Sequence, residues 1–140
     1  MARGVLGLLP VRVLLDANVV LALAESPMRL RPEVVDQLAA DATILIISTV
    51  SPWEIAIKWR TGRLPLPEHP RPWFARLVRE FGAQILPITQ EHVVHVADLP
   101  DHHDDPFDRL LIAQAQVERM PIVTADRSFA KYDVEVIAAR

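Results

Sequence analysis

The sequence predicts an α/β sandwich built around a mostly parallel central sheet. Several short apolar runs lack the alternation that is typical of a half-exposed strand, and segments with helical periodicity separate them. Strands without alternation are usually buried on both faces, as strands of a parallel sheet are. Strands that alternate with helices along the chain are typical of βαβ units.

The elements follow from the apolar pattern and its interruptions. The expected strands cover 11–15, 43–47, 85–88, 121–124 and 134–137. The expected helices cover 19–25, 32–40, 52–60, 72–81, 90–98 and 106–118. Gly82 stands where a helix commonly ends in a left-handed residue, and Thr89 stands where an N-cap is expected.

Length and composition indicate one globular domain. The 140 residues are predicted to form a single domain over 1–140, with residues 1–10 as a flexible N-terminal extension. The chain has no cysteine, which excludes disulfides and thiolate metal sites and favours a cytoplasmic location. No stretch resembles the roughly 18 apolar residues of a membrane span. The net charge of −3 argues against nucleic-acid binding through overall charge, but it is compatible with a local basic rim.

Two aspartates follow expected strands. Asp16 comes directly after the first strand, and Asp126 comes shortly after the fourth. Ligands of open α/β sheets bind outside the carboxyl ends of the strands. Aspartate is also common there as a turn or cap residue, so each position alone leaves both interpretations open.

Two further acids lie in the first turns of expected helices. The segments SPWE and DPFD each read as an N-cap, Ser51 or Asp105, then proline, an aromatic residue and an acid. Capping explains Asp105 well, and an exposed ion pair with Lys58 four residues on explains Glu54. Asp108 is harder to explain, because helical geometry places it within an apolar stripe where a carboxylate needs strong partners.

Convergence of these acids would predict a metal site. Buried carboxylates repel one another unless a cation lies among them, and oxygen ligands suit Mg²⁺, with Mn²⁺ as a substitute. Lys58, Arg60 and Arg109 could bind phosphates around it, although a solvated basic face explains them as well. The adjacent His102 and His103 lack the spacing of a zinc pair, and we expect solvated loop residues or substrate contacts.

Three segments carry a resemblance to a known family. They are LLDANVVLALAESP, STVSPWEIAIKWRTGRLPLP and LPDHHDDPFDRLLIAQAQVERMPIVTADRSFAKY. The chain resembles the PIN-domain ribonuclease toxins of the VapC type, from type II toxin–antitoxin systems, over about residues 11 to 137. The resemblance implies a three-layer α/β/α sandwich with an acidic Mg²⁺ site. By position, the catalytic and metal-binding residues are Asp16, Glu54, Asp108 and Asp126, with Asp105, Asn18 and Thr124 as assisting residues.

The resemblance also implies a function. Proteins of this kind are endoribonuclease toxins that hydrolyse RNA phosphodiester bonds with a metal-activated water. The resemblance further implies a cytoplasmic location, a homodimer and a cognate antitoxin as partner. The chain departs from the family at Ala17, where the family often has threonine or serine. The amide of Asn18 could replace that hydroxyl, since it offers both a donor and an acceptor.

Two alternatives remain open from the sequence. One is a catalytically inactive PIN-like binding module, in which the acids no longer hold metal. The other is a phosphatase that uses Asp16 as its nucleophile. Such phosphatases often carry a second acid two residues later, and this chain has Asn18 there.

Overall fold

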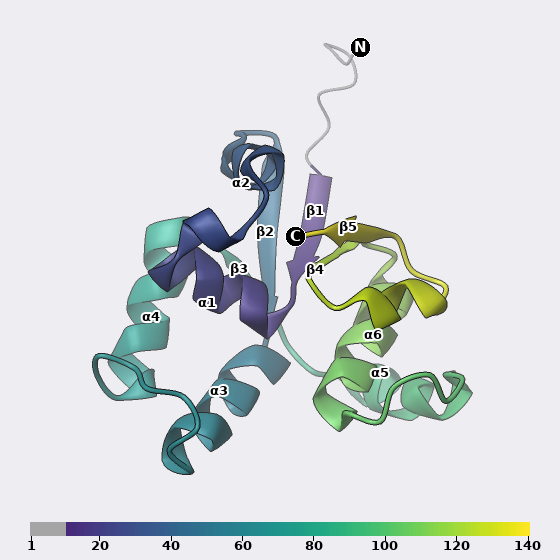
Figure 1. The fold of residues 1–140 in the computed structure, drawn as a ribbon. Helices are drawn as coiled ribbons and strands as arrows, with labels where there is room; N and C mark the ends of the chain where they lie inside the picture. The colour runs from purple at the N-terminus through teal and green to yellow at the C-terminus, as the bar shows by residue number, and fades with distance from the viewer. Residues whose placement is uncertain (1–10) are drawn as a thin grey trace.

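A computed structural model describes residues 11–140 of the chain (Figure 1). Five strands form one sheet in the order β3-β2-β1-β4-β5, and every neighbouring pair is parallel. The strands are β1 (Val11–Leu15), β2 (Thr43–Ser48), β3 (Gln84–Leu86), β4 (Ile122–Thr124) and β5 (Val136–Ala138). The predicted parallel sheet is confirmed, whereas the extension expected over residues 1–10 lies outside the described residues.

Helices cover both faces of this sheet. They are α1 (Ala17–Glu25), α2 (Pro32–Ala39), α3 (Val50–Arg60), α4 (Pro70–Phe81), α5 (Gln90–His95) and α6 (Pro106–Glu118). Three short 3₁₀ turns complete the chain: η1 (Pro27–Arg29), η2 (Val96–Asp98) and η3 (Arg127–Lys131). In Figure 1, α1 to α4 lie on one side of the sheet and α5 and α6 on the other, which confirms the three-layer sandwich. Between residues 11 and 140, no helix combines the length and the apolar composition that a membrane crossing requires.

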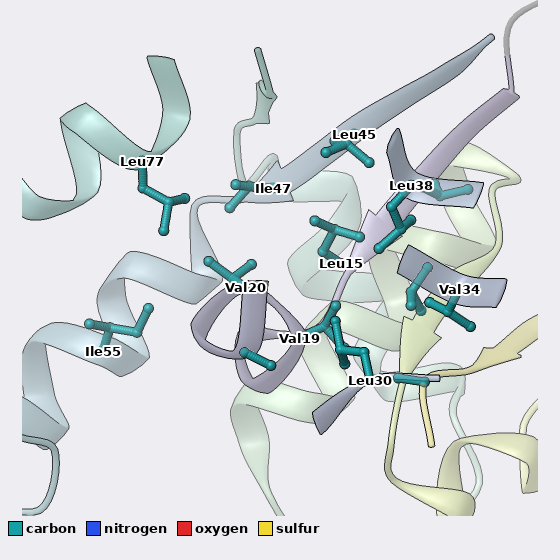
Figure 2. Packing of buried hydrophobic residues seen from close by; sticks show 14 of the residues in the cluster. Leu15, Val19, Val20, Leu30, Val34, Leu38, Leu45, Ile47, Ile55 and Leu77 are labelled. Carbon is teal, nitrogen blue, oxygen red and sulfur yellow. The ribbon is translucent and has the colours of Figure 1, made fainter. Parts of the chain in front are cut away.

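The central strand β1 is buried on both faces. Leu15 packs with Ile47 of β2 and Leu77 of α4 in one hydrophobic cluster, as Figure 2 shows. Leu14, the preceding residue, packs with Ile112 of α6 in the cluster on the opposite face. Successive side chains of a strand point to opposite faces, so both must be apolar here, and this explains the missing alternation in the sequence.

Three helices begin two residues earlier than predicted, at Ala17, Val50 and Pro70, and the start of α3 also changes a predicted cap. The helix α3 begins at Val50 with Thr49 as N-cap, and the backbone N–H of Trp53 already donates to the Thr49 carbonyl. The Ser48 hydroxyl accepts the N–H of Val50 at 3.0 Å, which lets the helix start directly after β2. Ser51 is therefore a buried helical residue, and the predicted capping box of Ser51 with Glu54 is wrong.

The predicted boundaries of α6 are confirmed. Asp105 is its N-cap, and its carboxylate accepts hydrogen bonds from the backbone N–H groups of Phe107 at 2.8 Å and Asp108 at 3.3 Å. The helix α4 ends at Gly82, which has φ 61°, as the sequence predicts. A residue without a Cβ adopts this left-handed conformation at little cost.

The order of the strands fixes the place of the functional side chains. Since β1 and β4 are parallel neighbours, with Leu15 opposite Val123, their carboxyl ends lie at the same edge of the sheet. Asp16 and Thr124 thus become neighbours although 107 residues separate them in the chain. The helices α3 and α6 contact each other, which brings their first turns toward this edge.

Replacing Leu14 by alanine tests the central place of β1. Leu14 is fully buried, so Leu14→Ala should lower the free energy of unfolding by roughly 2–5 kcal/mol through lost burial and the cavity it leaves. Urea denaturation followed by circular dichroism measures the change. Met28→Ala is the control, since Met28 is 90% exposed and its loss should cost no more than about 0.5 kcal/mol. Equal urea midpoints for the two variants would contradict the packing of β1.

Candidate functional site

Asp16 uses its backbone, not its carboxylate, to start a helix. Its carbonyl accepts hydrogen bonds from Val19 and Val20 at 2.9 and 3.1 Å, and its side chain makes no cap hydrogen bond. The carboxylate instead accepts a hydrogen bond from the Thr124 hydroxyl at 2.8 Å. Helix capping therefore does not explain why an acid occupies this position.

Burial makes the Asp16 carboxyl a weaker acid than that of an exposed aspartate. The residue is 5% exposed, and this burial raises the pKa of its carboxyl to about 6. The hydrogen bond from Thr124 acts in the opposite direction, while the negative charges of Glu54 and Asp126 raise the pKa further. A positive charge beside the carboxylate would reverse this shift, because it would favour the ionised form.

Asp108 is perturbed in the same direction. Burial again is the largest cause and raises the pKa of its carboxyl to about 7, and the negative charges of Asp16 and Asp105 add to it. The nearby ring of His103 acts in the opposite direction. The place of Asp108 in an apolar stripe of α6 thus has the predicted electrostatic consequence, since the charged form is poorly solvated there.

A histidine joins two of the acids. The Nε2 atom of His103 lies 2.9 Å from Asp108 Oδ2 and 3.0 Å from Asp126 Oδ2. One ligand atom from each of these three residues lies within 4.8 Å of the others. The sequence predicts a solvated loop residue or a substrate contact at His103. The only sequence feature that could have indicated a role in the site is its position five residues before Asp108. The direction of the ring depends on the conformation of the loop, which sequence patterns do not determine.

Asp126 serves a turn as well as the site. Its backbone N–H donates to Thr124 Oγ1 at 3.0 Å, and its Oδ1 accepts from the backbone N–H and hydroxyl of Ser128 at 2.9 and 2.7 Å. Partial burial alone would raise the pKa of its carboxyl. The hydrogen bonds from Ser128 and His103 outweigh burial, and the pKa lies below its ordinary value. The cap and site interpretations of Asp126 are therefore compatible.

Glu54 lies in the second turn of α3 and is buried. Its Oε2 lies 2.6 Å from Lys58 Nζ, so the ion pair expected four residues apart is present. The carboxylate is shielded from solvent, whereas the sequence predicts an exposed pair. Burial strengthens the interaction of the two charges but makes each depend on the other, because an unpaired charge is costly there.

The basic residues divide into two groups. Arg109 donates to the backbone carbonyls of Pro100 at 2.9 Å and of Val96 and Leu99 at 3.3 Å each. This guanidinium holds the loop before α6, a geometry that favours a structural role over phosphate binding. Arg60 is exposed near the end of α3 and is free of such contacts within residues 11–140.

The assisting residues also differ in position. Thr124 is buried between Asp16 and Asp126 and hydrogen-bonds to both. Asn18 is exposed and lines a cavity of about 450 Å³ together with Arg29 and Arg140. Among residues 11–140, the Asn18 amide makes no hydrogen bond to a site acid, whereas the hydroxyl of Thr124, the other residue expected to assist, donates to Asp16.

The donor set suits a hard divalent cation. The carboxylates of Asp108 and Asp126 lie together beside His103, and the carboxylate of Asp16 is close enough to raise the pKa of Asp108. Carboxylate oxygen is the ligand type that Mg²⁺ and Mn²⁺ prefer. Burial, and to a smaller extent the neighbouring negative charges, raise the pKa values of the Asp16 and Asp108 carboxyl groups.

Comparisons with known proteins identify the fold family. A family model described as PIN domain matches residues 13–135. A comparison of the sequence with curated proteins finds no match.

Several solved structures are similar. VapBC2 from Rickettsia felis, bound to a DNA fragment from its promoter, has a TM-score of 0.70 at 12% identity. The match covers 92% of this chain and 99% of the Rickettsia felis chain. DNA-bound VapBC from Salmonella typhimurium has a TM-score of 0.66 at 13% identity, with coverages of 91% and 98%. FitAcB from Neisseria gonorrhoeae has a TM-score of 0.61 at 22% identity, with coverages of 89% and 96%. At these identities, the likeness shows the fold.

The raised pKa values predict how stability depends on pH without divalent ions. In the folded state the carboxyl groups of Asp16 and Asp108 have pKa values of about 6 and 7, against an ordinary value of 3.8. At pH values between these limits, the folded state therefore binds more protons than the unfolded state. The free energy of unfolding should therefore fall as pH rises from about 4 to about 7. Asp126 has the opposite shift, and its contribution is lost below this window.

Asp108→Asn isolates one of these contributions. The variant has no proton to lose, so we expect it to exceed the wild type in stability at pH 7.5 by on the order of 1 kcal/mol. Urea unfolding at pH 4.5 and 7.5 in a chelator measures the difference. Asp104→Asn removes an exposed loop acid and is the matched control. The same pH dependence in both variants would contradict the assignment to Asp108.

Proposed function

Because the chain belongs to the PIN-domain family, we propose that it is a Mg²⁺- or Mn²⁺-dependent endoribonuclease and the toxin of a toxin–antitoxin pair. The observation that carries the proposal is that the buried Asp16 and the half-buried Asp108, both with raised carboxyl pKa values, lie beside Asp126 at the carboxyl edge of the sheet. Structural capping accounts for Asp105, but it leaves the Asp16 carboxylate unexplained.

The four acids divide the work of holding the ion. Asp16, Asp108 and Asp126 would bind it directly or through water, and Glu54 would hold a water from the side of α3. When bound, the ion polarises a phosphoryl oxygen and lowers the pKa of a water. Thr124 keeps the Asp16 carboxylate oriented, and Lys58 keeps Glu54 in place. No side chain needs to form a covalent bond with the substrate.

The hydrolysis itself needs a proton acceptor and a proton donor. A water attacks phosphorus and forms a new P–O bond, while the bond from phosphorus to the leaving ribose oxygen breaks. One of the site carboxylates is placed to take the proton that the water loses. The leaving oxygen regains a proton from solvent or from the same pool of acids.

Two aromatic rings support RNA as the substrate class. Trp53 and Phe107 directly precede Glu54 and Asp108, and their ring centroids are 4.6 Å apart in an edge-to-face contact. Trp53 is 50% exposed although it lies beside buried acids. Unpaired RNA bases stack on such exposed aromatic faces. Arg60, on the same helix as Trp53, is available to bind a backbone phosphate.

The antitoxin belongs to the proposal as well. The similar structures from Rickettsia felis and Salmonella typhimurium are named as VapBC bound to DNA, and a third as FitAcB. We infer a cognate antitoxin for this chain from its fold and from the resemblance of its motifs. A homodimer and a cytoplasmic location complete the proposal on the same basis.

RNA cleavage by two aspartate variants tests the function. Asp108→Asn should lower the rate by roughly 100-fold or more, because it removes a charge that acts on the transition state. Asp105→Asn should retain most activity, since asparagine caps a helix as well as aspartate does. Purified proteins are assayed on labelled RNA with Mg²⁺. Equal cleavage by wild type and Asp108→Asn would contradict the site, and cleavage of single-stranded DNA alone would contradict the substrate.

Stabilisation by Mn²⁺ separates a nuclease from an inactive binding module. An ion that binds the folded state alone adds about 2.7 kcal/mol of stability at 100 times its Kd. We expect Mn²⁺ to raise the Tm of the wild type and to have little effect on Asp16→Asn, which keeps an oxygen for Thr124 but loses the charge. Differential scanning calorimetry measures both shifts. A wild type that does not respond to Mn²⁺ would favour the inactive module.

A further inference from the structure

We propose that His103 is a positioning residue: its Nε2–H holds the carboxylates of Asp108 and Asp126 together for the divalent ion, and the ring does not bind the ion itself. The inference rests on the proposed function, because it assumes that these acids hold a metal. It comes from hydrogen bonds on both sides of the imidazole ring.

The chain fixes which ring nitrogen carries the proton. The Nδ1 atom of His103 accepts a hydrogen bond from the backbone N–H of Asp105 at 3.1 Å. A neutral imidazole that accepts at one nitrogen carries its proton on the other, so Nε2 is the donor. The Nε2–H hydrogen-bonds to Asp126 Oδ2 at 3.0 Å, and Asp108 Oδ2 lies 2.9 Å from the same nitrogen. A protonated nitrogen has no lone pair for a metal, which excludes His103 as a ligand in this geometry.

Three contacts hold His103 in place. Its ring makes an edge-to-face contact with Phe129, which is fully buried, at a centroid distance of 5.9 Å. Its backbone carbonyl accepts a hydrogen bond from Arg109 at 3.4 Å, and the same guanidinium binds other carbonyls of the loop. The Asp105 N–H fixes the rotation of the ring. An imidazole held in this way orients the groups that it contacts, as outer partners of metal ligands do.

Asp126 is the acid that most needs such a partner. Its side chain is 38% exposed, so repulsion from Asp108 could turn it toward solvent. Ser128 already donates twice to Oδ1, and His103 donates once to Oδ2. A carboxylate offers about four lone-pair sites, which leaves one site on Oδ2 for an ion. The histidine and the ion can therefore use the same oxygen without competing for one lone pair.

Substitutions of His103 separate the two ring nitrogens. In His103→Gln the amide N–H stands in for Nε2–H, whereas the shorter His103→Asn can replace Nδ1 but does not reach the acids. His103→Ala removes both. His102→Ala is the matched control, because the His102 ring is exposed and packs edge-to-face on Tyr132. Binding of Mn²⁺ to the full chain is measured by isothermal titration calorimetry, after circular dichroism has shown that each variant is folded.

We expect His103→Ala and His103→Asn to weaken Mn²⁺ binding by about 10–100-fold, as loss of an outer partner does. The affinities of His103→Gln and His102→Ala should stay within a few-fold of the wild type. In the metal-free wild type, a long-range ¹H–¹⁵N spectrum at pH 8 should show His103 as the Nε2–H tautomer.

Other outcomes would overturn the inference. If His103→Ala binds Mn²⁺ as tightly as the wild type, or more tightly, the ring does not organise the site. If folded His103→Gln binds Mn²⁺ as weakly as His103→Ala does, or if His102→Ala loses as much affinity, donation from Nε2 is not the cause of the tighter binding by the wild type. A wild type that does not bind Mn²⁺ removes the proposed metal site along with this inference, whereas normal wild-type binding confines the failure to His103.

Discussion

The partial or full burial of several carboxylates at one edge of the sheet is the constraint on which the rest of the site depends. Parallel strands end at the same edge, so Asp16, directly after β1, lies beside the residues that follow β4. The first turn of α6 adds Asp108 to the same place. Burial and like charge then raise the pKa of both carboxyl groups, to about 6 and about 7. The fold concentrates negative charge where water cannot fully solvate it, and a divalent cation would compensate that charge.

Three side chains serve as partners of the four acids. Thr124 donates to Asp16, Lys58 pairs with Glu54, and the imidazole of His103 lies between Asp108 and Asp126. Under the proposed function, such contacts would keep the carboxylates together in the absence of an ion, so that less reorganisation would be needed on binding. Arg109 contributes from a distance, because it ties together the carbonyls of the loop that carries His103. Of the basic residues predicted to form a rim, Lys58 therefore pairs with a site acid and Arg109 holds a loop.

Much of the fold follows from the sequence, because burial on both faces of β1 leaves a direct trace in its composition. The burial of Asp108 follows in the same way from the apolar stripe of α6. Contacts made by loops leave no periodic trace. The start of α3 depends on the Ser48 hydroxyl, and Arg109 binds backbone carbonyls that any sequence would offer. The role of His103 depends on a ring orientation that the following cap residue, Asp105, determines.

Crystals soaked in Mn²⁺ and measured at a wavelength where manganese scatters anomalously provide the most direct test of the central claim. The account predicts an anomalous peak at the carboxyl edge of β1 and β4, bonded to an oxygen of Asp16 and to at least one of Asp108 and Asp126. His103 should remain within hydrogen-bond distance of the acids and not be bonded to the metal. Manganese bound elsewhere, with the four acids unchanged and no peak among them, would contradict the account.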